Sequence, residues 1–215
     1  MNYKARILKS KFLLKAERGA IVIIAAIAML ALTGLMALSI DAAGYYGQMS
    51  RQTNASSMVK QAVGAARTTV LNNAQDPGKT IAETSARVLR ENGIDGEISV
   101  HYFEDIDRAS KTDRLAAFAI EVDGTYVCML GPMVGISELN VESVVFDTVD
   151  FYSSSVVWRP RWTNESDPTA YSVDNGTYTW AEGAAWDSEP TYTARDSASA
   201  FPDVVASGFG DVFAG

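Results

Sequence analysis

The chain has 215 residues, with 26 acidic and 18 basic side chains, and it contains a single histidine and a single cysteine. Residues 1–18 hold six of the cations and one carboxylate, so the remainder carries a net charge of −13. This balance argues against a nucleic-acid partner, which requires cations clustered on one face of a folded domain. The lone Cys128 excludes an intrachain disulfide, so stability must come from a packed core.

Residues 19–40 form an apolar run without a charged side chain, and ten of its 22 residues are Leu, Ile or Val. As an α-helix this run is about 33 Å long, close to the roughly 30 Å hydrocarbon thickness of a bilayer. We therefore predict a transmembrane helix with membrane lipid as its partner. A cleaved secretory signal peptide is the alternative, because Ala42, Ala43 and Gly44 offer a small-x-small cleavage site.

The basic leader, residues 1–18, sets the orientation of that helix. Lys and Arg residues that flank a span stay on the cytoplasmic side of the membrane. We expect a single-pass protein of the inner (cytoplasmic) membrane, with its N-terminus inside and its acidic C-terminal part extracytoplasmic.

The helical pattern continues beyond the apolar run. Apolar or small residues recur at alternating spacings of three and four over residues 45–70, which lines one face of a helix. Because no proline precedes Pro77, we predict that the helix continues over residues 41–73. We call residues 41–73 the outer half of the helix and expect it to be the central packing element of an extracytoplasmic domain over residues 41–149.

A second helix is expected over residues 81–92. Thr80 and Glu83 have the spacing of a capping box, in which each residue's side chain satisfies a backbone N–H of the other. Gly93 stands where a left-handed residue ends a helix.

Residues 97–149 change from a helical period to a period of two, which predicts the strands of a three- or four-stranded antiparallel sheet. Asp123 and Gly124 form a dipeptide typical of a two-residue hairpin turn. The preceding helix is available to cover the apolar face of the sheet. The expected fold class is therefore α+β, with a long N-terminal helix packed on a small antiparallel sheet.

Residues 150–215 form an aromatic extension rich in Ser, Asp and Gly, which we expect to be strand and loop. All four tryptophans lie there, and Asp174, Asn175 and Gly176 predict a hairpin. Rings among small polar residues are typical of adhesive or sugar-binding surfaces, which makes Trp162, Trp180 and Trp186 a candidate binding surface. A core role for the same rings is the alternative. From residue 197 onward too few apolar residues recur periodically to predict regular structure.

Few residues in the chain are suited to catalysis. His101 alternates along a predicted strand and is interpreted as a partly exposed residue, while Cys128 is interpreted as a buried small hydrophobe. Carboxylates cluster between Glu104 and Asp113, yet the glycine and the closing glutamate of an EF-hand are missing, so a solvated loop is favoured over a calcium site. The sequence therefore predicts no enzyme, no cofactor and no metal site.

The first third of the chain resembles a known pattern. Its matching residues flank and follow the apolar run: Glu17, Arg18, Gly19, Ala20, Asp41, Gly44, Tyr46, Arg51, Asn54 and Ala55. They are similar to the N-terminal segment of TadE/TadG-like proteins of the tight-adherence (Tad or Flp) pilus system. The resemblance implies a pilin-like fold and a role in pilus assembly, secretion or cell-surface adhesion. It also implies partners among other pilus or envelope-assembly subunits, including the chain's own copies through the N-terminal helix.

Two sites follow from this resemblance. Gly19 and Ala20 form a possible processing site, although Ile24 stands where processed pilins usually carry glutamate, so a permanent anchor is the alternative. Asp41, at the outer edge of the span, is a possible assembly contact to a neighbour or to a freed N-terminal amine; an ordinary charged helix boundary is the other interpretation. A second function also stays open, an anchored module that binds glycan or protein through its aromatic extension.

Overall fold

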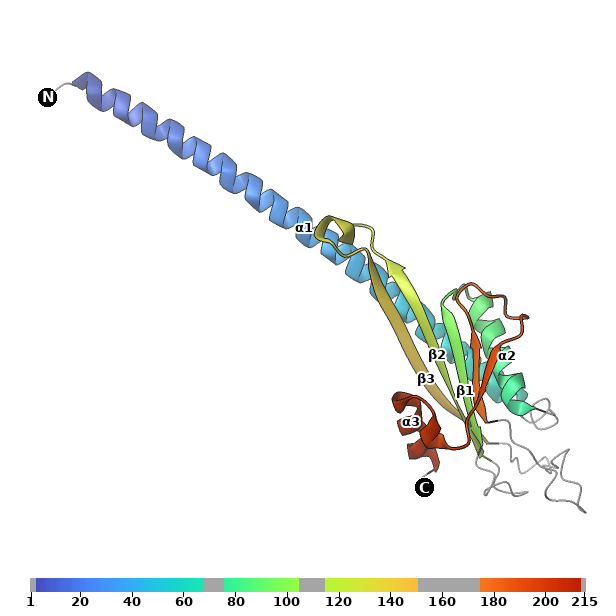
Figure 1. Ribbon diagram of the computed structural model, residues 1–215. Helices are drawn as coiled ribbons and strands as arrows, with labels where there is room; N and C mark the ends of the chain where they lie inside the picture. Colours follow the sequence, from blue (N-terminus) through green and yellow to red (C-terminus); the bar gives the residue numbers. More distant parts are fainter. Residues whose placement is uncertain (1–2, 68–75, 105–114, 151–174, 214–215) are drawn as a thin grey trace, which may run out of the picture. The chain divides into compact units, whose positions relative to one another are not determined.

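The computed structural model describes residues 3–67, 76–104, 115–150 and 175–213 (Figure 1). Its contacts divide the chain into two compact units. The anchor unit comprises residues 1–45 and 127–138, and the sheet unit comprises residues 46–126 and 139–215. The predicted α+β class is confirmed, because a long N-terminal helix precedes a small sheet.

Helix α1 spans Tyr3–Ala66 and contributes to both units. It has no proline, and its apolar run is long enough and apolar enough to cross a membrane, as the sequence predicts. Beyond the run, Ala55, Val59 and Val63 are buried in the sheet unit. The spacing of four between these three residues places them on one helical face, which confirms the amphipathic outer half. The predicted extension to residue 73 falls mostly outside the described residues.

Helix α2 spans Pro77–Glu91 and begins four residues before the predicted start. Asp76 is its N-cap: the Asp76 carboxylate accepts the Lys79 backbone N–H at 2.8 Å, and Pro77 occupies the first turn. The expected capping box is therefore wrong, because the Thr80 hydroxyl instead donates to the Asp76 carbonyl. The predicted left-handed Gly93 is confirmed by its φ of 72°.

A five-stranded sheet forms the centre of the sheet unit, in the order β3-β2-β1-β4-β5. The strands are β1 Glu97–Glu104, β2 Leu115–Val127, β3 Glu138–Asp150, β4 Gly176–Trp180 and β5 Thr191–Ala194. The pairs β1–β2, β1–β4 and β4–β5 are antiparallel. The aromatic extension thus supplies two strands to the sheet. The first arm of the hairpin expected before Gly176 lies outside the described residues.

The hairpin turn expected at Asp123 and Gly124 is wrong, because β2 runs straight through both residues. Asp123 pairs with Glu97 of β1 as the last pair of that ladder, and β2 itself continues beyond Gly124 to Val127. A side chain at Gly124 would meet the Gln52 amide at 3.1 Å. The glycine therefore permits close approach of the strand to α1, which in this chain outweighs its local preference for a turn.

The sheet unit has three layers, with helices on both faces of the sheet (Figure 1). One face packs against α2 and the outer half of α1, around Val100, Ile120 and the fully buried Trp180. The opposite face is covered by α3, Asp203–Phe213, whose Phe209 is fully buried. The sequence pattern gives no prediction of order after residue 197, and the helix forms there because Phe201 and Phe209 anchor this short segment on the sheet.

Arg90, which the sequence does not single out, connects α2 to the loop between β4 and β5. Its guanidinium donates to four backbone carbonyls, those of Ile94, Gly96, Ala181 and Ala184, at 2.7–2.9 Å. Burial lowers the pKa of Arg90, although nearby carboxylates oppose that change. The side chain thereby supplies hydrogen-bond donors to carbonyls that lie outside the helix and strand ladders.

Candidate functional site

The apolar part of α1 presents its side chains outward in the anchor unit. Leu30 is 78% exposed, and every residue from 21 to 40 is exposed except the partly buried Ala37. The Thr33 and Ser39 hydroxyls donate back to carbonyls one turn earlier, at 2.8 Å each. The polar groups of the run therefore need no water, which suits a helix surrounded by lipid or by other helices.

The predicted processing residues, Gly19 and Ala20, lie within α1. Their backbone is helical, and cleavage between them stays a prediction.

Asp41 follows the apolar run and is only 5% exposed. Its Oδ1 accepts the backbone N–H of Met129 at 2.8 Å, and its Oδ2 accepts those of Leu130 at 3.1 Å and Gly131 at 2.6 Å. Three successive amides thus converge on one carboxylate, as in an anion-binding nest. We call this arrangement the Asp41 clamp. It uses both carboxylate oxygens within the chain, whereas an intermolecular contact of Asp41 stays a prediction.

The clamp holds a short loop between β2 and β3. The Cys128 N–H donates to the Ser137 carbonyl at 2.9 Å, and a 3-10 turn at Gly131–Val134 follows. A side chain at Gly131 would lie 2.7 Å from Cys128 Cβ, so only glycine fits there. Cys128 is buried, as predicted, and burial together with the negative charge of Asp41 raises the pKa of its thiol. Both effects disfavour the reactive thiolate form of Cys128.

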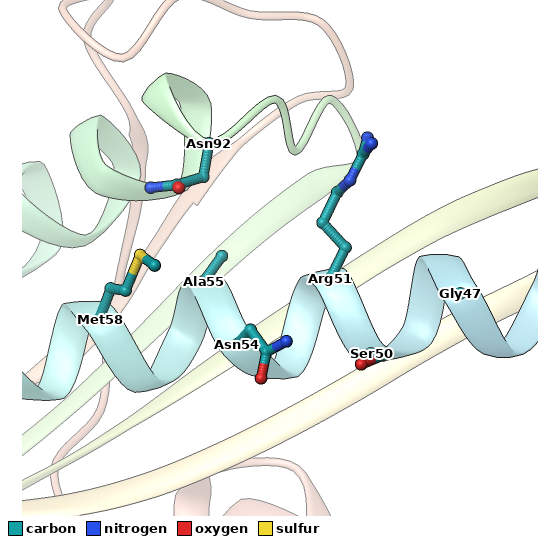
Figure 2. A pocket seen from close by; sticks show the side chains of 7 residues that line it. All are labelled: Gly47, Ser50, Arg51, Asn54, Ala55, Met58 and Asn92. Carbon is teal, nitrogen blue, oxygen red and sulfur yellow. The ribbon is translucent and has the colours of Figure 1, made fainter.

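A polar hollow of about 410 Å³ lies beside α1 in the sheet unit. Figure 2 shows Arg51, Asn54 and Met58 projecting from α1, and Asn92 from the end of α2. The hollow is open, and its polar side chains are the Arg51 guanidinium, the Asn54 and Asn92 amides and the Ser50 hydroxyl. Arg51, Asn54 and Ala55 carry part of the TadE/TadG-like resemblance, and all three line this hollow.

His101 is buried, not partly exposed as the sequence predicts. Its Nδ1 lies 2.9 Å from the Thr177 hydroxyl, and its Nε2 lies 3.0 Å from a Glu121 carboxylate oxygen. Phe201 covers the ring edge-on, which explains the burial. The hydrogen bond from His101 lowers the pKa of Glu121, while burial of the carboxyl opposes it.

This row of hydroxyl, imidazole and carboxylate has the residue types of a catalytic triad. Thr177 is nevertheless buried at 8% exposed, and the hollow beside α1 is lined by other residues. The row lies on the sheet face that α3 covers, which favours a structural hydrogen-bond network.

The tryptophans do not form one surface. Trp180 is 1% exposed and its indole donates to the Ser188 carbonyl, so the core interpretation holds for this residue and it is unavailable to a ligand. Trp186 is 39% exposed, with the Arg87 guanidinium 5.9 Å from its ring centroid. Trp162 lies outside the described residues.

The carboxylate cluster expected near residues 104–113 falls mostly outside the described residues as well. Glu104, its first member, is buried and accepts the Tyr102 hydroxyl at 2.7 Å. Within the described ranges, no group of three or more His, Cys, Asp or Glu side chains is arranged to hold a metal ion.

Comparison of the chain with protein-family models, curated proteins and solved structures gives no match at a significant level.

Proposed function

We propose that the chain is a non-enzymatic, membrane-anchored, pilin-like protein that takes part in Tad/Flp-type pilus assembly or cell-surface adhesion. The observation that supports this proposal is that the two halves of α1 have different surroundings. One helix has an exposed apolar half, at residues 21–40, and an outer half whose Ala55, Val59 and Val63 belong to the core of a small sheet domain.

Such a helix suits a subunit that moves between two apolar surroundings. In the bilayer its exposed half contacts lipid, and in a filament the same surface packs against equivalent helices of other subunits. Lipid tails are about as apolar as leucine, so helix association in a membrane depends on packing and not on water exclusion. The exchange leaves the sheet unit unchanged because its core uses only the outer half of α1.

The orientation and partners follow from charge and exposure. Six cations in residues 1–18 favour a cytoplasmic N-terminus, in a single-pass inner-membrane arrangement. The hollow at Arg51, Asn54 and Asn92 offers donors for polar contact with a neighbouring subunit.

A gene deletion tests the proposal. Loss of surface filaments and adhesion is expected, with recovery when the full chain is restored. Leu30→Arg should fail to restore them, because a cation at the centre of a span costs about 2.5–3.5 kcal/mol of insertion. Ser57→Arg, on the exposed face of the outer half, is the matched control and should restore them. Filaments, adhesion and secretion that persist in the deletion strain would contradict the proposal.

A second candidate, an anchored binding module, is favoured by one observation. Trp186 is partly exposed, and Tyr192 nearby in sequence is 42% exposed, so rings of the aromatic extension reach solvent. Replacing Trp162 and Trp186 with alanine should abolish binding to a glycan array while the sheet unit keeps its melting temperature. Unchanged binding would rule out this function for those rings.

A further inference from the structure

The loop that the Asp41 clamp holds is apolar on its outside. Residues 124–137 contain no Asp, Glu, Lys or Arg, in a part of the chain that carries a net charge of −13. Four of its large side chains point into solvent: Val127 is 66% exposed, Met129 77%, Met133 77% and Ile136 44%. Exposed apolar side chains that gather in one place mark an interaction site. We call Val127–Ile136 the apolar loop.

The clamp fixes where the apolar loop lies along α1. Asp41 is the residue directly after the apolar run, and its carboxylate is hydrogen-bonded to the Met129, Leu130 and Gly131 amides at 2.6–3.1 Å. The loop therefore lies beside α1 at the level where the predicted span ends, as Figure 1 shows for the short turn next to the helix.

Exposed apolar side chains also lie on the part of α1 that precedes Asp41. On the last turns of the run Leu35 and Leu38 are each 62% exposed and Ile40 is 51% exposed. Both surfaces belong to the anchor unit, so one environment has to accommodate them together.

We propose that the apolar loop inserts into the outer interface of the bilayer that α1 spans. The headgroup region extends several Å beyond the hydrocarbon on each side, so side chains at the level of Asp41 fall within it. Absence of charge matters because a charged side chain loses hydration when it enters an apolar environment, whereas the loop carries no charged side chain. The proposal rests on the membrane anchor of the proposed function and adds a second lipid contact to it.

Insertion gives the Asp41 clamp a further role. A single helix leaves its domain free to tilt and rotate relative to the membrane, while two lipid contacts held together by Asp41 limit that freedom. Unbranched methionine side chains suit a loose lipid environment because they adapt their shape to it.

A fluorescent label placed at single cysteines tests the insertion. The full chain, with Cys128→Ala, is reconstituted in vesicles of phosphatidylcholine and phosphatidylglycerol. Met129→Cys and Met133→Cys carry an environment-sensitive label in the loop, Leu30→Cys reports the span, and the exposed Glu83→Cys on α2 reports water. Emission wavelength, quenching by aqueous iodide and quenching by spin-labelled lipid are measured for each.

Labels at Met129 and Met133 should emit at shorter wavelength than the label at Glu83, resist iodide several-fold better and be quenched by lipid spin labelled near the headgroup. Iodide quenching equal to that at Glu83 overturns the insertion. Protection from iodide without quenching by lipid also overturns it, and shows that another copy of the chain covers the loop. A Leu30 label that lipid does not quench would instead contradict the membrane anchor, so the two failures are distinguishable.

Discussion

The anchor unit and the sheet unit place their apolar residues in opposite ways. In the sheet unit, Trp180, Tyr102 and Phe118 are among the largest fully buried side chains, and they belong to the core that packs one face of the sheet against α1 and α2. In the anchor unit, the large apolar side chains from Ile21 to Ile40 are exposed, whereas the acidic Asp41 is buried.

The difference shows what each unit depends on. The sheet unit carries its own core and is stabilised by apolar burial of about 25 cal/mol per Å². The described large apolar side chains of the anchor unit at residues 21–40 are exposed, so they require lipid or other helices as surroundings. Its loop is held by a few hydrogen bonds to the Asp41 carboxylate. Variants that separate these two sources of stability test the comparison.

The largest effect is expected from Trp180→Ala. Truncation of a fully buried aromatic ring leaves a cavity and costs about 3–5 kcal/mol of unfolding free energy. The sheet unit should unfold at markedly lower denaturant concentration, while the chain still fractionates with membranes because α1 is unchanged. Loss of membrane association together with unfolding would show that the two units are not independent.

A smaller, local effect is expected from Asp41→Ala. Three backbone amides lose a charged acceptor, so protection of the Met129, Leu130 and Gly131 amides should fall by about 2 kcal/mol, roughly 30-fold in hydrogen exchange. Amides of β1 should keep their protection. Asp41→Asn retains one carbonyl oxygen and should lose less. Unchanged exchange in Asp41→Ala would mean that the clamp contributes nothing to the order of the loop.

A still smaller effect concerns pH. The hydrogen bond from His101 lowers the pKa of Glu121 in the folded chain, so the ionised carboxylate stabilises the sheet unit at pH values above the ordinary glutamate pKa near 4.3. That contribution, below about 1 kcal/mol for a partly exposed pair, disappears as pH falls through the lowered folded value. Glu121→Gln should flatten the dependence of unfolding free energy on pH in that acidic window. An unaltered pH dependence of the unfolding free energy would show that Glu121 does not stabilise the sheet unit in this way.

A comparably small effect is expected from Trp186→Ala, the matched control for Trp180→Ala. The ring is 39% exposed and contacts a guanidinium at the surface, an arrangement worth about 0.5–1 kcal/mol. Thermal unfolding should shift by a few degrees at most. A destabilisation as large as that of Trp180→Ala would show that the ring belongs to the core.

The elements that could be predicted are those encoded by a repeating local pattern. The apolar run and the period of three and four along α1 identified one helix with two roles, and the period of two identified β1 and the first part of β2. The hairpin turn predicted at Asp123 and Gly124 is wrong because a dipeptide indicates only a local conformational preference. The pairing of Asp123 with Glu97 is a tertiary contact that the dipeptide does not encode. Helix α3 escaped prediction because it is only eleven residues long and is held by rings packed on the sheet.

The candidate site depended even more on distant contacts. The place of Asp41 at the end of the run marks it as a candidate, but the amides that bind it are about ninety residues later in the chain and have no local signature. The strand pattern predicts a partly exposed His101 because nothing in the sequence indicates that Phe201 covers that face. Arg90 has no sequence signal because its four partners are all backbone carbonyls, which any sequence supplies.

Photo-crosslinking in the native membrane tests whether the apolar half of α1 is an assembly element and not only a tether. A benzophenone side chain replaces Leu30, which is 78% exposed, and a control chain carries it at the buried Val59. After irradiation we expect covalent dimers and higher multiples of the chain from position 30 and none from position 59. Lipid adducts alone at position 30, in cells that display filaments, would contradict it.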